Sequence, residues 1–95
     1  MILNIYYFID KFNKNEIEKL SSKISLIYRN YGKKSDSIEL KKLILYCKSK
    51  RRKVYISNNL KIAIKFNFDG LYIPSFNKSL RFRNIVRDNF EILGS

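Results

Sequence analysis

The sequence contains no histidine and no tryptophan, and it has only one cysteine, one proline and three glycines. Without histidine, the chain has neither an imidazole for acid–base chemistry near neutral pH nor the histidine ligands of a zinc cluster. Its single cysteine, Cys47, cannot form a disulfide within the chain. Because Cys47 falls in an apolar helical stripe, we interpret it as a small core residue.

Acidic residues are also scarce, since 8 Asp and Glu stand against 20 Lys and Arg, for a net charge of +12. Such a charge makes an anionic partner a hypothesis. The basic residues are spread along most of the chain, which favours ordinary solvent-exposed positions. The densest basic run supports the alternative of a small nucleic-acid-binding protein, in which the phosphates would contact Lys48, Lys50, Arg51, Arg52 and Lys53. No recognisable motif for reading DNA or RNA accompanies this run.

Long apolar runs are absent too. The apolar start, Met1–Ile9, has no basic flank and reaches Asp10 quickly, so it fits neither a membrane span nor a signal peptide. We therefore expect a first strand there, no membrane association and a cytoplasmic location. With 95 residues, of which 45% are hydrophobic, the chain can form one domain with a packed core.

Short apolar runs alternate with helical patterns along the whole chain. The runs predict strands near 5–9, 24–28, 53–57, 70–73 and 91–94. Helical spacing between them predicts four helices, which begin near Asn13, Asp36, Leu60 and Leu80. The order predicts an α/β fold with about five parallel strands, adjacent in sequence order, and four helices packed on one face.

The dipeptide Asp69-Gly70 leaves a local alternative open, because it also suits a two-residue hairpin turn. We favour a strand–helix–strand crossover, since the residues from Leu60 recur at helical spacing instead of alternating. Asn67 also stands where a left-handed helix cap is favoured. Such a crossover joins parallel strands.

Polar residues follow every predicted strand. In order along the chain they are Asp10, Arg29 with Asn30, Ser57 with Asn58, Ser75 with Asn77, and Ser95. In (β/α) barrels the loops after the strands form the functional face. Any parallel sheet would share part of this pattern, so strand ends that simply meet water are the alternative.

Two segments resemble motifs of the thiamine-phosphate synthase/TenI family. Residues 56–58, ISN, align with its I-N-D, and residues 67–77, NFDGLYIPSFN, align with G-A-D-G-V-H-L-G-Q-x-D without a gap and keep Asp69-Gly70. Arg29 matches the arginine of Q-x-R-x-K, and residues 43–47 match an L-x-x-x-C helix. Residues 92–95, ILGS, resemble the family's I-I-G-x-S strand. The resemblance implies that residues 1–95 form a single, incomplete (β/α)8 barrel, a TIM barrel, of thiamine biosynthesis. The family's synthases join a pyrimidine diphosphate to a thiazole phosphate with magnesium and release pyrophosphate, whereas TenI relatives isomerise a thiazole compound.

The departures from the family pattern imply impaired catalysis. Asn58 and Asn77 stand where the family has the aspartates that hold magnesium, and an amide brings no charge to a metal that favours carboxylates. Ile27 and Tyr31 replace the Gln and Lys of Q-x-R-x-K. A full barrel needs about 200 residues or more, so we expect self-association or a partner chain to complete this one.

The resemblance thus implies a site for a phosphorylated pyrimidine in which Arg29 is the principal cation. The neutral hydrogen-bond partners would be Ser57, Asn58, Ser75, Asn77 and Ser95, without an assigned metal. A non-catalytic, ligand-binding or partner-dependent remnant of the family is the alternative to a surviving enzyme.

Overall fold

The computed structural model describes residues 5–29, 36–74 and 90–94. Along the chain it forms β1 (Ile5–Ile9), α1 (Lys14–Glu18), β2 (Ile24–Tyr28), α2 (Ser37–Ser49), β3 (Val54–Ser57), α3 (Leu60–Lys65), β4 (Gly70–Ile73) and β5 (Glu91–Gly94). The strands build one parallel sheet in the order β1-β2-β3-β4-β5. The predicted α/β fold is confirmed, and a hairpin at Asp69-Gly70 is excluded because β3 and β4 run parallel. The helix predicted near Leu80 lies outside the described residues.

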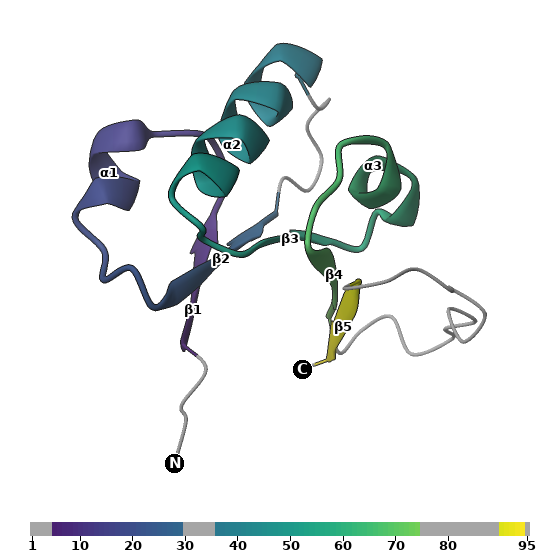
Figure 1. Cartoon of the computed structure of the whole chain (residues 1–95). Coiled ribbons are helices and arrows are strands. Elements are labelled where there is room, and N and C mark those ends of the chain that lie inside the picture. Colours follow the sequence, from purple (N-terminus) through teal and green to yellow (C-terminus); the bar gives the residue numbers. More distant parts are fainter. Residues whose placement is uncertain (1–4, 30–35, 75–89, 95) are drawn as a thin grey trace.

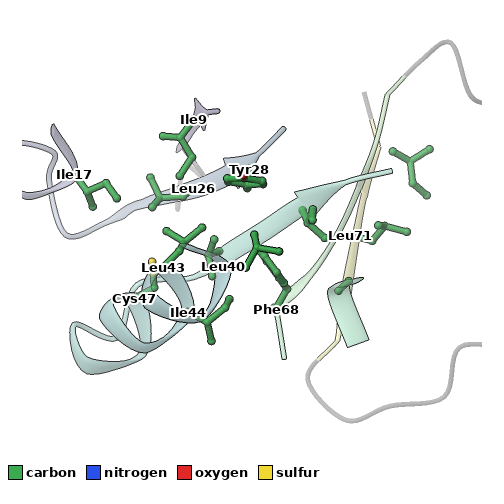
Figure 2. Packing of buried hydrophobic residues seen from close by; sticks show 14 residues of the cluster. Ile9, Ile17, Leu26, Tyr28, Leu40, Leu43, Ile44, Cys47, Phe68 and Leu71 are labelled. Carbon is green, nitrogen blue, oxygen red and sulfur yellow. The ribbon is translucent and has the colours of Figure 1, made fainter. Parts of the chain in front are cut away.

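The described helices cover one face of the sheet (Figure 1). Side chains alternate along each strand, and one set from β1 to β4 packs against these helices, as Figure 2 shows. The predicted stripe of α2 faces this core, and Cys47 is buried within it, where burial raises the pKa of its thiol to about 12. The core consists of Ile9, Ile17, Leu26, Tyr28, Leu40, Leu43, Ile44, Cys47, Val54, Ile56, Ala63, Phe68, Leu71 and Ile73.

Side-chain caps start all three described helices. Asn13, Asp36 and Asn59 accept hydrogen bonds from backbone N–H groups in the first turns of α1, α2 and α3. Asn67 has a φ of 60° just after α3, as its predicted capping role requires. None of these helices is long and apolar enough to cross a membrane.

Helix α1 is shorter than its apolar spacing predicts. It ends at Glu18, and Ile24, which continues the helical spacing of Ile17, is the first residue of β2. Tight backbone bonds from Leu20 N to Ile17 O and from Ile24 N to Ser21 O turn the chain between the two elements. The apolar residues Ile17, Leu20 and Ile24 therefore keep helical spacing in the sequence although only Ile17 lies in a helix.

Arg52 is buried, although the sequence places it in a solvated basic run. Its guanidinium donates hydrogen bonds to the carbonyl oxygens of Ser21 and Ile24 at 2.9 and 2.6 Å, and to those of Ile17 and Leu20 at 3.4 and 3.3 Å. These carbonyls belong to the end of α1 and the turn into β2. A planar, permanently charged donor suits such a cluster of acceptors.

We predict that Arg52→Met lowers the free energy of unfolding by about 2–4 kcal/mol, because it leaves buried carbonyl groups without donors. Arg52→Lys should lose a smaller amount, since one ammonium cannot span all the acceptors. Urea denaturation at pH 7 measures both effects. Lys50→Met is the control because Lys50, the C-cap of α2 two residues before Arg52, is exposed. An equal loss of stability in this variant would contradict the assignment.

The face of the sheet without described helices is strongly concave. The rings of Phe8 on β1 and Tyr72 on β4 have centroids only 5.3 Å apart, although neighbouring strands are about 4.8 Å apart and these two are separated by β2 and β3. A flat sheet would hold the rings roughly three strand spacings apart. The curvature buries Ile27 and Tyr55 on this face, although no described helix covers them.

Gly70 permits the close approach of β5 to β4 inside this curve. A Cβ atom at position 70 would lie 2.0 Å from the carbonyl oxygen of Glu91 and 2.8 Å from a ring carbon of Tyr55. Both neighbours are fixed by the sheet, so the strand has no room for any side chain.

We predict that Gly70→Ala costs at least about 2 kcal/mol of unfolding free energy, because β5 must separate from β4 or the backbone must shift. Gly94→Ala is a matched control on β5, since an added Cβ there meets nothing within 4 Å. Thermal denaturation followed by circular dichroism compares the two variants. Equal stability of Gly70→Ala and Gly94→Ala would show that the strands are not this close.

Candidate functional site

The carboxyl ends of all five strands lie at one edge of the sheet, which we call the rim. Tyr28 pairs with Ile56, so Arg29 and Ser57 are the next neighbours across β2 and β3. Ser57 in turn pairs with Tyr72 on β4. The register therefore places a cation, a hydroxyl and a phenol side by side on the concave face, about 5 Å apart from strand to strand.

Arg29 is held by an aromatic ring. Its guanidinium carbon lies 4.6 Å from the ring centroid of Phe8, and its backbone N–H donates to the carbonyl oxygen of Ile9 at 2.8 Å. The ring of Phe8 packs edge-to-face on Tyr72. Arg29 is exposed, so its charge remains available while the stacking contact restricts its orientation.

Neutral polar groups continue the rim after β3. Ser57 is buried, whereas the following Asn58 is exposed and adopts a left-handed φ of 54°. The backbone N–H of Asn58 donates to the carbonyl oxygen of Tyr72 at 2.8 Å, which ties this turn to β4. Asn tolerates the left-handed region better than most residues, so Asn58 suits this turn and brings no charge to it.

Half of the predicted site falls within the described residues. Arg29, Ser57 and Asn58 follow the neighbouring strands β2 and β3 at the rim, while Ser75, Asn77 and Ser95 lie outside the described part of the chain. Phe8 and Tyr72 also belong to the rim, although no sequence motif marks them as site residues. Their shared face could have been inferred from strand alternation, but their contact depends on curvature, which no local pattern reveals.

The rim is a poor fit to a magnesium ion. Asn58 offers a neutral amide, and the carboxylate nearest in register is Asp10, which follows β1 beside Arg29. Magnesium bound by proteins favours one or two carboxylates together with phosphate oxygens. Among residues 5–29, 36–74 and 90–94 there is also no group of three Asp, Glu, Cys or His side chains that could hold a metal. We therefore assign no step to a metal here.

A second polar cluster lies at the opposite, amino-terminal edge of the strands. Glu91 accepts hydrogen bonds from the Tyr55 hydroxyl and, at 3.0 Å, from Lys53 Nζ. These bonds lower the pKa of Glu91 and raise the pKa of Lys53, while burial and the bond to Glu91 raise the pKa of Tyr55. Each of these shifts favours the usual charge state of the group at neutral pH.

The basic run of the nucleic-acid hypothesis is broken up by the fold. Arg52 is buried on backbone carbonyls, which corrects its expected role as a phosphate contact. Lys53 pairs with Glu91 on β5. Only Lys48, Lys50 and Arg51 of that run remain as exposed cations outside an ion pair with a described carboxylate.

Comparisons of the chain with protein-family models, with curated proteins and with solved structures found no match. The function must therefore be argued from the residues and their geometry.

We predict that Glu91→Gln lowers the free energy of unfolding by about 1 kcal/mol at pH 7, because it weakens the bonds from Tyr55 and Lys53. The folded pKa of Glu91 lies below its ordinary 4.5, so its stabilising effect is complete above pH 4.5 and is lost as the pH falls through the lower value. The difference between wild type and Glu91→Gln should therefore shrink in acid.

Urea denaturation between pH 3 and pH 8 measures this difference. Glu18→Gln is the control, because Glu18 forms an exposed pair with Lys14 at 3.9 Å, and such pairs contribute little. A Glu91→Gln effect that grows as the pH falls would refute the assignment.

Proposed function

We propose that the described strands form part of a (β/α)8 barrel of the thiamine-phosphate synthase/TenI type, and that its rim binds a phosphorylated pyrimidine without magnesium. The observation that carries this proposal is Arg29, a cation stacked on Phe8 at the mouth of a concave parallel sheet. Function in such sheets is concentrated at the carboxyl ends of the strands.

The packing of the concave face supports the barrel. In a (β/α)8 barrel the interior is filled by layers of side chains from alternate strands. Here the ring of Tyr6 on β1 lies 5.9 Å from that of Tyr55 on β3, and the Tyr55 hydroxyl bonds Glu91 on β5. One layer from alternate strands is thus already formed across the curve.

The chemistry of the rim supports a phosphate ligand. Arg29 can donate two parallel hydrogen bonds to phosphate oxygens, and these charge-assisted bonds are among the strongest available to proteins. Ser57 and Asn58 supply neutral polar groups beside it. Tyr72 on β4 is half-buried, and its aromatic ring offers a surface on which a planar pyrimidine can pack.

Catalysis of the family reaction by this chain alone is not part of the proposal. Departure of pyrophosphate requires cations that neutralise the developing charge. Among the described rim residues, Arg29 is accompanied by Asn58 where the family carries a metal-binding aspartate. We therefore propose a ligand-binding protein in place of an active synthase.

We predict that calorimetric titration with a pyrimidine diphosphate analogue detects binding that magnesium does not strengthen. Arg29→Ala should weaken binding at least tenfold, because it removes the charge-assisted bonds. Phe8→Leu should weaken it two- to fivefold through loss of the cation–π contact that orients Arg29. Lys23→Ala is the control, since this exposed cation precedes β2 at the opposite edge of the sheet.

Three results would contradict the proposal. They are binding that requires magnesium, binding that is equal in wild type and Arg29→Ala, and formation of thiamine phosphate by the chain alone.

Edge residues Ile5 and Ile92 are 52% and 43% exposed, which supports a second copy or a partner chain against the sheet. Light scattering on the titrated samples should therefore show self-association. A monomer at every protein concentration would contradict the proposal that a second copy packs against the sheet.

A further inference from the structure

A groove on the outer surface separates α2 from α3, far from the rim chemistry. Its floor is apolar and consists of Ile44, Leu45 and Phe66, which we call the groove floor. Its edges carry three cations, the groove lysines Lys41, Lys48 and Lys65, and Asn67 completes the lining. Among the residues that the structure describes, no acidic side chain lines this groove.

The groove floor combines an exposed and a recessed part. Leu45 is 68% exposed, whereas Ile44, on the same helix turn, is only 5% exposed. Leaving an apolar side chain such as Leu45 in water forgoes about 25 cal/mol for each Å² that a partner could cover. The recess at Ile44 beside the exposed Leu45 favours a partner segment that enters the groove over a partner with a flat surface.

The groove lysines carry uncompensated charge. The ion pairs among the described residues are Lys14 with Glu18 and Lys53 with Glu91, so neither involves a groove lysine. Lys65 instead lies over the Phe66 ring, with its Nζ 5.6 Å from the centroid. Cations around an apolar floor are complementary to an anionic ligand that also has an apolar side.

The spacing on α2 matches a helix. Lys41, Ile44, Leu45 and Lys48 occupy positions i, i+3, i+4 and i+7 and form one stripe. Two lysines seven residues apart are separated by about 10.5 Å along the axis. A partner helix with acidic residues seven apart and leucines between them presents the same spacing with the opposite charge.

We propose that this groove binds an amphipathic, acidic helix of a partner protein, with apolar side chains on the groove floor and carboxylates on the groove lysines. This is the helix-in-groove mode of recognition. Nucleic acid fits less well, because the floor is largely aliphatic and the ring of Phe66 already has Lys65 over it. The inference does not depend on the proposed function at the rim.

The probe is a fluorescein-labelled 18-residue helical peptide with glutamates at i and i+7 on either side of leucines at i+3 and i+4. Fluorescence anisotropy should show saturable binding that weakens with added salt. Leu45→Ser should weaken it at least fivefold, and Lys41→Glu with Lys48→Glu at least tenfold. Lys42→Glu is the matched control, because Lys42 is exposed on α2 but does not line the groove.

A charge exchange sharpens the test. Binding lost in Lys48→Glu should be regained with a peptide in which the facing glutamate is replaced by lysine, because the pair is restored in reverse. Equal binding of a peptide with serines in place of both leucines would overturn the proposal, as would a loss in Lys42→Glu as large as that in Lys48→Glu. Single-stranded RNA or phosphatidylserine vesicles could also bind more tightly than the peptide and displace it, with the same dependence on Leu45, Lys41 and Lys48. That result would assign the groove to another class of partner and refute the proposal of an acidic helix.

These variants also keep the two proposals separate. All the substituted side chains are exposed, so circular dichroism should show an intact fold. Because the groove and the rim lie on opposite faces of the sheet, groove variants should leave titration of the pyrimidine diphosphate analogue unchanged, and Arg29→Ala should leave peptide binding unchanged.

Discussion

The contacts of Tyr55 across the concave face are the interaction on which the rest of the structure depends. From the central strand β3, its ring reaches Tyr6 on β1 and its hydroxyl reaches Glu91 on β5. These contacts require a curved sheet, and a curved sheet in turn brings Phe8 to Tyr72 and places Arg29 at the mouth. Gly70 is part of the same constraint, because a side chain there would separate β4 from β5 beside the Tyr55 ring.

The two faces of the sheet differ in what the sequence can predict about them. On the helix-covered face, strand alternation and the stripe of α2 are local patterns, so strand positions, parallel order and the burial of Cys47 followed from them. The concave face is built from contacts between strands that are far apart in the sequence. Neither the burial of Tyr55 nor the support of Arg29 by Phe8 has a local signal, and both appear only when the sheet curves.

Arg52 shows a different limit of sequence analysis. Within the run from Lys48 to Lys53 every position is basic or Ser49, so nothing in the residue types distinguishes a buried cation from its exposed neighbours. The distinction comes from the turn between α1 and β2, where several carbonyl oxygens point at one place. Charge counted along a sequence therefore overstates the charge that a partner meets, and the basic surface is best judged after such internal roles are removed.

Two chemically distinct places on that basic surface combine cations with other groups. At the rim, one guanidinium held against a ring faces a polar, concave mouth, which suits a small anion with a planar base. In the α2–α3 groove, lysines surround an aliphatic floor, which suits a larger partner with both charge and apolar area. Because the sheet separates them, binding at one site need not alter the other. A ligand could influence the groove only by changing the curvature of the sheet, and the closely packed Tyr55 layer resists such a change.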